Sequence, residues 1–178
     1  MISSYGYILV FEDDVIPTIP TNTIITYIAK LMECMTRIAT TCDMLYLEYC
    51  NEFCLLTTKV TRELAKAHGP SCTAAILYNV NSLKKILNVL KAQRYRLSID
   101  MAYKAAIEKG DLQAFIATPP LFVQDTTQFE TSISSYIFRY IFGYQSCNTK
   151  AIAYMIAIVC VIVLIPILSL IFIMMHRA

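Results

Sequence analysis

The stretch YGYILVFEDD, at residues 5–14, joins a mostly apolar run to three consecutive acidic residues. Residues 5–11 are rich in aromatic and branched side chains, which favour extended structure, and the run ends abruptly at Glu12, Asp13 and Asp14. A buried strand shows this pattern when its C-terminal end reaches a cleft. The stretch therefore predicts a core strand that brings three carboxylates to one edge of a sheet.

The remainder of the first 135 residues alternates between helical and extended patterns. Apolar side chains recur at helical spacing in three segments, and shorter β-prone runs lie between them. Strands that alternate with helices predict an α/β fold. The predicted elements after the first strand are a helix that begins after Thr21 or Asn22 and fades by Thr40, a strand at 43–50, a strand at 73–78, a helix from Asn79 or Asn81 through Leu90, a helix at 101–109 that stops at Gly110, and a strand at 112–118.

The three acidic residues need an explanation. Carboxylates at the end of a buried strand repel one another, and the repulsion is costly unless a cation or capping groups offset it. Hard oxygen ligands of this kind suit Mg²⁺ or Mn²⁺ holding a diphosphate. The alternative interpretation is a solvated turn in which Asp13 or Asp14 caps the next element. Spacing alone leaves both interpretations open.

The composition excludes several classes of protein. The first 150 of the 178 residues carry 14 Lys and Arg against 13 Asp and Glu, because one of the 15 basic residues, Arg177, lies beyond them. This balance is too even for a nucleic-acid-binding protein that works by counterion release. The four glycines form neither a P-loop nor a G-x-G-x-x-G turn, the usual phosphate-binding loops. His68, the one histidine in this part, is more typical of a loop or core position than of a catalyst.

The C-terminal run at residues 151–175 is 25 residues long, apolar and free of charge. At about 1.5 Å of rise per residue, a helix of this length exceeds the roughly 30 Å of hydrocarbon in a bilayer. We therefore predict a single membrane-spanning helix in a lipid bilayer, in preference to a buried core helix. The predicted organisation is a domain at 1–135, a juxtamembrane linker at 136–150, the span, and a short tail at 176–178. Residues 1–14 do not resemble a signal peptide, so we expect a tail anchor with the domain in the cytosol.

The seven cysteines give a weaker indication. They form no C-x-x-C pair, and the chain has no N-x-S/T glycosylation acceptor, which mildly favours a reducing compartment. Cys50, Cys54 and His68 are conceivable zinc ligands, but their spacing is poor and a fourth ligand would have to come from elsewhere. We therefore expect scattered core thiols rather than a zinc site.

Residues 7–15, YILVFEDDV, resemble the strand and acidic motif of the lipopolysaccharide-biosynthesis and procollagen-galactosyltransferase family. The similarity continues at 68–77 and 82–87, where that family has a strand of small residues followed by an amphipathic helix. LSIDM, at 97–101, resembles the family's aspartate with proline or apolar neighbours, and PPLFVQDTTQFETSIS, at 119–134, resembles its closing segment. These ordered motifs cover most of the predicted domain.

The resemblance implies a GT-A glycosyltransferase fold of Rossmann-like type, with a nucleotide-sugar donor, a glycan acceptor and Mn²⁺ or Mg²⁺. Glu12 and Asp14 would hold the metal and the donor diphosphate, with Asp13 between them in the donor site. Gln124 matches the glutamine of the closing segment and would also bind on the donor side. Asp100 matches the later aspartate and would be the catalytic base or orienting group on the acceptor side. A helix N-cap is the alternative for Asp100.

The sequence departs from the family pattern before the acidic motif. Only eleven residues precede Glu12, so we expect most of the nucleotide-binding half that the family places there to be missing. We then expect the first strand to have an exposed edge that a partner chain or a membrane covers. The function predicted is that of a membrane-anchored, truncated derivative that serves as a binding or interaction module. The alternative is an active metal-dependent glycosyltransferase, completed by a partner chain.

Overall fold

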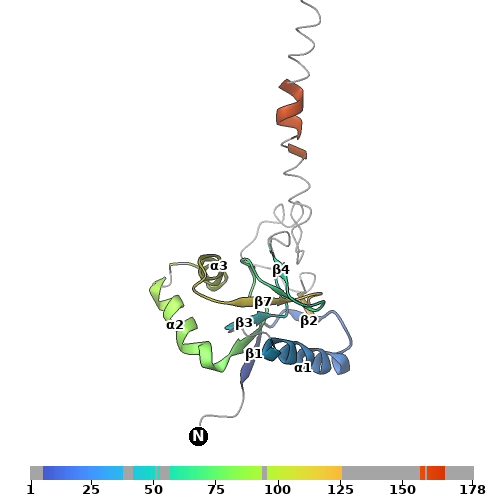
Figure 1. Ribbon diagram of the computed structural model, residues 1–178, viewed down its shortest axis with the longest axis vertical. Coiled ribbons are helices and arrows are strands. Elements are labelled where there is room, and N and C mark those ends of the chain that lie inside the picture. The colour runs from blue at the N-terminus through green and yellow to red at the C-terminus, as the bar shows by residue number, and fades with distance from the viewer. Residues whose placement is uncertain are drawn as a thin grey trace, which may run out of the picture.

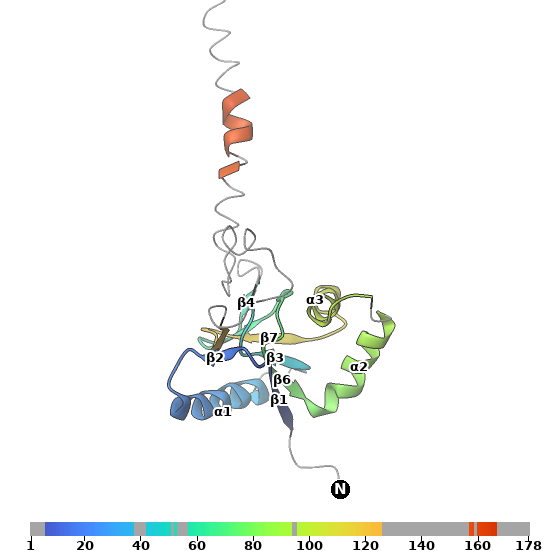
Figure 2. The same ribbon diagram turned by 180° about the vertical axis from the view of Figure 1, so that it is seen from behind.

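The computed structural model describes residues 6–37, 42–50, 52, 57–93, 96–125, 157–158 and 160–166. Within these residues a mixed sheet forms the centre of an α/β domain, and helices cover both of its faces (Figures 1 and 2). Helix α1 (Thr21–Arg37) packs on one face. Helices α2 (Leu83–Ala92) and α3 (Ile99–Lys109) pack on the other face.

The central sheet has six strands. In order across the sheet they are β1 (Tyr7–Phe11), β6 (Ala75–Asn79), β3 (Met44–Tyr46), β7 (Ala114–Ala117), β5 (Leu64–Lys66) and β4 (Thr58–Lys59). Strands β3 and β7 are parallel, and the other neighbouring pairs are antiparallel. Among the described residues, β1 lies at one edge and pairs with β6 alone. A second, two-stranded sheet pairs β2 (Val15–Pro17) with β8 (Phe122–Gln124), and a short 3₁₀ helix, η1 (Val80–Ser82), precedes α2.

The side chains of β3 alternate between two hydrophobic cores. Leu45 belongs to the core under α1, together with Ile24 and Leu31 of that helix. Met44 and Tyr46 belong to the core under α2 and α3. Because successive side chains of a strand point to opposite faces and both faces are covered, the central strands are apolar throughout.

Four short strands, β2, β4, β5 and β8, are not among the elements predicted from the sequence. Each has only two or three residues, which is too few to produce a recognisable alternation of apolar and polar side chains. The omission matters for function, because β2 and β8 position a residue of the candidate site.

The prediction of a transmembrane helix at residues 151–175 is wrong. Within the described part of the chain, no helix is both long enough and apolar enough to cross a membrane. The described helical residues of this run are 157–158 and 160–166. This finding corrects three predictions: the C-terminal transmembrane helix in the fold class, the tail anchor and the single-pass membrane location. The other residues of 136–178 lie outside the described residues.

Candidate functional site

Acidic residues meet where two strands end beside the beginning of a third. Strands β1 and β3 lie on the two sides of β6 and both run antiparallel to it, so their C-terminal ends reach the start of β6. The Glu12 amide donates to the carbonyl oxygen of Ala74 at 2.9 Å, and the Glu48 amide donates to that of Ala75 at 3.3 Å. Glu12, which follows β1, and Glu48, which follows β3, therefore flank the same short segment.

The small β2–β8 sheet brings Gln124 to the same place. Val15 pairs with Gln124 in this sheet, and the Asp125 amide donates to the Asp14 carbonyl oxygen at 2.7 Å. The Gln124 side-chain nitrogen Nε2 donates to Glu12 Oε2 at 3.2 Å and to Asp14 Oδ2 at 3.3 Å. Three of the predicted site residues, Glu12, Asp14 and Gln124, are thus in contact. Together with Glu48 they form what we call the acidic cluster.

The acidic cluster contains polar atoms that lack partners. Thr73 Oγ1 donates to Glu12 Oε1 at 2.6 Å. The buried oxygens Asp14 Oδ1, Glu48 Oε2 and Gln124 Oε1 have no hydrogen-bond partner among the described residues. Buried polar atoms are usually hydrogen-bonded, so these three oxygens are candidate acceptors for a further ligand. Asp13, which like Glu12 is exposed, lies in the turn between β1 and β2.

Glu48 is the member of the cluster that sequence reasoning missed. Its side chain is only 4% exposed. Burial, and then the charges of Glu12 and Asp14, raise the pKa of Glu48 from its ordinary value of 4.5 to about 8, although a hydrogen bond with the Ala74 backbone partly offsets the rise. In the strand predicted at 43–50, Glu48 is a charged residue within the otherwise apolar run 44–50, and this was the signal that could have revealed it.

Asp100 does not join the acidic cluster through any hydrogen bond among the described residues. It lies in the first turn of α3, whose N-cap position is occupied by Ser98, so the N-cap interpretation of Asp100 is wrong. The pKa of Tyr46 is raised well above its ordinary value, mainly because Tyr46 is buried. The negative charge of Asp100 adds to this rise, as do the charges of Tyr103, Glu52 and Glu48. The Tyr46 hydroxyl is buried and has no hydrogen-bond partner in the described part of the structure.

The residues of the cluster can be tested against the predicted metal. In the described ranges, no group of three or more His, Cys, Asp and Glu side chains is arranged to hold a metal ion. A third oxygen beside Glu12 and Asp14 would have to come from Gln124, whose Oε1 is unpaired. A rotation of the Gln124 amide by half a turn about its last side-chain bond would exchange the positions of Oε1 and Nε2. Oε1 would then lie beside Glu12 Oε2 and Asp14 Oδ2, where Nε2 lies now. The donor chemistry, two carboxylates and one amide oxygen, therefore fits Mg²⁺ or Mn²⁺.

A disulfide bond lies directly beside the acidic cluster. It joins Cys50 to Cys72, whose Cα atoms are 5.6 Å apart. The expectation of unpaired core thiols is therefore wrong for these two residues, and Cys50 cannot serve as a zinc thiolate. Cys34, Cys42 and Cys160 are free, and Cys54, the other cysteine of the zinc interpretation, lies outside the described residues.

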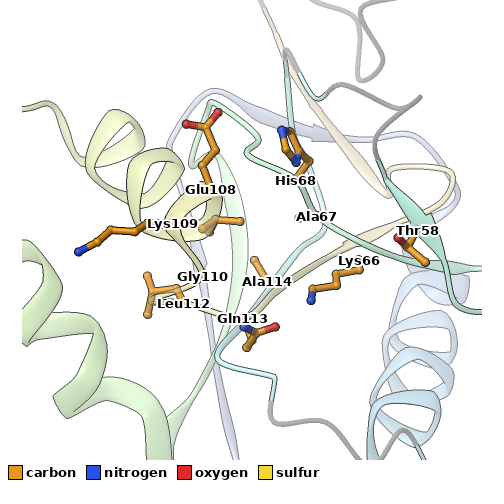
Figure 3. A pocket seen from close by; sticks show the side chains of 11 residues that line it. Thr58, Lys66, Ala67, His68, Glu108, Lys109, Gly110, Leu112, Gln113 and Ala114 are labelled. Atoms are coloured by element: carbon orange, nitrogen blue, oxygen red, sulfur yellow. The ribbon is translucent and has the colours of Figure 1, made fainter.

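A separate pocket of about 310 Å³ lies between β5 and the C-terminal end of α3 (Figure 3). Lys66 and Gln113 lie toward one end of it, and His68 and Glu108 lie toward the other. Glu108 is paired with Lys104 at 2.8 Å. No residue of the acidic cluster lines this pocket, so the two features are distinct.

Comparisons with known proteins leave the function open. No family model matches the chain, and no curated protein matches it. The similarity of its motifs to a glycosyltransferase family therefore stays a prediction. The geometry of the acidic cluster is the basis for the functional proposal.

Proposed function

We propose that this domain is a binding module that takes up a divalent cation, and with it the diphosphate of a nucleotide sugar, at the acidic cluster. The observation that carries the proposal is the position of the Gln124 amide, whose nitrogen bridges Glu12 and Asp14. The neutral Gln124 amide points its partly positive N–H hydrogens at two carboxylates, and a cation in the same place would interact with them more strongly.

The electrostatics of the cluster support a cation rather than an anion alone. Three carboxyl groups lie close enough together for Glu12 and Asp14 to raise the pKa of Glu48. An isolated diphosphate would be repelled by the carboxylates of Glu12 and Asp14, whereas a divalent cation would be attracted to them and would retain open positions for phosphate oxygens. The cation would hold the anionic ligand at a site that would otherwise repel it.

The nucleotide sugar is proposed as the source of the diphosphate because of the order of the motifs. The acidic motif at 7–15, the aspartate segment at 97–101 and the closing segment at 119–134 resemble the same family of glycosyltransferases. In the structure the first and last of these segments are brought into contact through Glu12, Asp14 and Gln124. A motif order that resembles the family, together with this contact, supports a diphosphate-sugar ligand.

Glycosyl transfer to a glycan acceptor is the second candidate function. The observation in its favour is that the charges of Asp100 and Glu48 both add to the rise in the pKa of Tyr46, the last residue of β3. Asp100 would act as base or orienting group. Because β1 is an edge strand among the described residues, a partner chain could pair with it and supply the rest of a donor site.

The proposal is tested by calorimetric titration of the full chain with Mn²⁺, in the absence and presence of uridine diphosphate. We expect Mn²⁺ to bind, and the diphosphate to bind measurably only when Mn²⁺ is present. Asp14→Asn should weaken Mn²⁺ binding at least tenfold, because it removes one of two anionic ligands. Asp13→Asn is the matched control, since it makes the same change one residue away on an exposed side chain. The proposal is wrong if the unaltered chain binds no Mn²⁺, or if both variants bind it equally.

A further inference from the structure

The Cys50–Cys72 disulfide connects the two chain segments that support the acidic cluster. Cys50 lies two residues after Glu48, and Cys72 immediately precedes Thr73. The same segments are also joined by two backbone hydrogen bonds, from the Cys50 amide to the Ser71 carbonyl oxygen at 3.1 Å and from the Ser71 amide to the Cys50 carbonyl oxygen at 2.9 Å. The covalent link therefore lies within two residues of the side chains that build the site.

A short series of contacts leads from Cys72 into the cluster. Thr73 Oγ1 donates to Glu12 Oε1 at 2.6 Å, and the Glu12 amide donates to the Ala74 carbonyl oxygen at 2.9 Å. Cys72 has a φ angle of 69°, in the left-handed region that residues with a side chain rarely adopt. Such a conformation persists only where the surroundings hold it, and the disulfide is the covalent part of those surroundings. Opening the link would remove this covalent constraint from residues 71–74, which position Thr73 against Glu12.

We infer that Cys50–Cys72 is a reversible redox site whose oxidised form holds the acidic cluster in its cation-binding arrangement. The inference rests on the function proposed above, because cation binding is what the redox state would control. The reducing partner is a dithiol, the chemical class that opens a protein disulfide by thiol exchange. Cys72 is the more exposed of the two residues, since it is partly exposed whereas Cys50 is only 3% exposed, and we therefore infer that the reductant attacks the Cys72 sulfur.

The exchange balances in two steps. A thiolate of the dithiol attacks Cys72 Sγ; the protein S–S bond breaks, and Cys50 leaves as a thiolate that takes up a proton. The second thiol of the reductant, as its thiolate, then attacks the reductant's own sulfur in the mixed disulfide, so that Cys72 leaves as a thiolate and is protonated. Two electrons pass to the protein, and the dithiol becomes a disulfide. The free thiol of Cys42 is a poor nucleophile for attack on this disulfide. Burial, followed by the charge of Asp43, raises the pKa of the Cys42 thiol to about 12, so little thiolate is present.

The first experiment compares oxidised full-length chain with chain that has been reduced by dithiothreitol and freed of the reagent under anaerobic conditions. We expect the reduced chain to bind Mn²⁺ at least fivefold more weakly in calorimetry, and reoxidation to restore the affinity. The double variant Cys50→Ser/Cys72→Ser should behave like the reduced chain. Cys34→Ser, which removes a free cysteine in α1, should behave like the oxidised chain.

A second measurement does not depend on metal binding. Hydrogen exchange at the amides of Glu12, Cys50 and Ser71 should become at least fivefold faster on reduction, because their hydrogen-bond acceptors lie in the segments that the disulfide joins. Equal Mn²⁺ affinity with equal exchange in both redox states overturns the inference. Mn²⁺ can also fail to bind either redox state while hydrogen exchange still accelerates on reduction. In that case the proposed function and the redox control of cation binding are both wrong, and only the structural coupling between the disulfide and the acidic cluster stands. If the double variant does not fold, the reduced native chain still decides the question.

Discussion

The protonation state of Glu48 makes the site testable through its effect on folding. Glu48 is 4% exposed, and burial together with Glu12 and Asp14 raises its pKa to about 8. In the folded chain this carboxyl group holds its proton at neutral pH, whereas in the unfolded chain it releases the proton above its ordinary pKa of 4.5. The free energy of unfolding must therefore fall as the pH rises between these two values. Glu48→Gln removes the effect, because an amide of the same shape does not titrate.

The magnitude follows from the size of the shift. One pKa unit corresponds to about 1.36 kcal/mol, so a rise from 4.5 to about 8 corresponds to at most about 5 kcal/mol. Between pH 6 and pH 8 the unaltered chain should lose about 2–3 kcal/mol of unfolding free energy relative to Glu48→Gln. At roughly 3 °C per kcal/mol for a domain of this size, the two melting temperatures should diverge by about 8 °C.

The assay is urea and thermal unfolding of the full chain at pH 6, 7 and 8, with a chelator present so that no cation competes with the proton. Glu33→Gln is the control, because Glu33 lies on the surface of α1 with a side chain that is 60% exposed. Its stability profile should remain parallel to that of the unaltered chain. If Glu48→Gln also remains parallel from pH 6 to pH 8, Glu48 is not the protonated, buried group described here.

Two further predictions concern the framework around the site. Asp43→Ala should lower the free energy of unfolding by about 2–4 kcal/mol. The reason is that Asp43 is 2% exposed and accepts hydrogen bonds from Lys85 Nζ at 2.5 Å and from the Gln113 amide at 2.7 Å. A urea denaturation midpoint close to that of the unaltered chain would contradict this prediction. Gly110→Ala should cost about 1 kcal/mol, because Gly110 ends α3 with a φ angle of +85° while an added Cβ would meet no atom within 4 Å. Thermal unfolding measures this loss, and an unchanged or higher melting temperature would show that the left-handed conformation is not required.

Some of the fold could be read from local patterns. The apolar run of β1 and the acidic residues at its end are both present in the structure. The prediction of a buried core strand is wrong, however, because β1 lies at the sheet edge among the described residues and Ile8, Val10 and Phe11 are 44–46% exposed. The three helices lie close to the segments with helical spacing, although α3 begins at Ile99, two residues before the predicted start. Residues 151–175 show the limit of this approach, because uniform apolarity predicted a membrane span that the described residues do not contain.

By itself, the sequence determined which segments are apolar strands and amphipathic helices and where the acidic motif stands, since these properties depend on neighbours a few residues away. The tertiary structure alone decided which side chains meet. Gln124 reaches Glu12 across 112 positions because the two- and three-residue strands β2 and β8 pair, and Glu48 joins them because β3 is antiparallel to β6. The disulfide between Cys50 and Cys72 was likewise decided by the pairing of Cys50 with Ser71. Such contacts depend on strand order and register, which are set by packing across the whole sheet rather than by local periodicity.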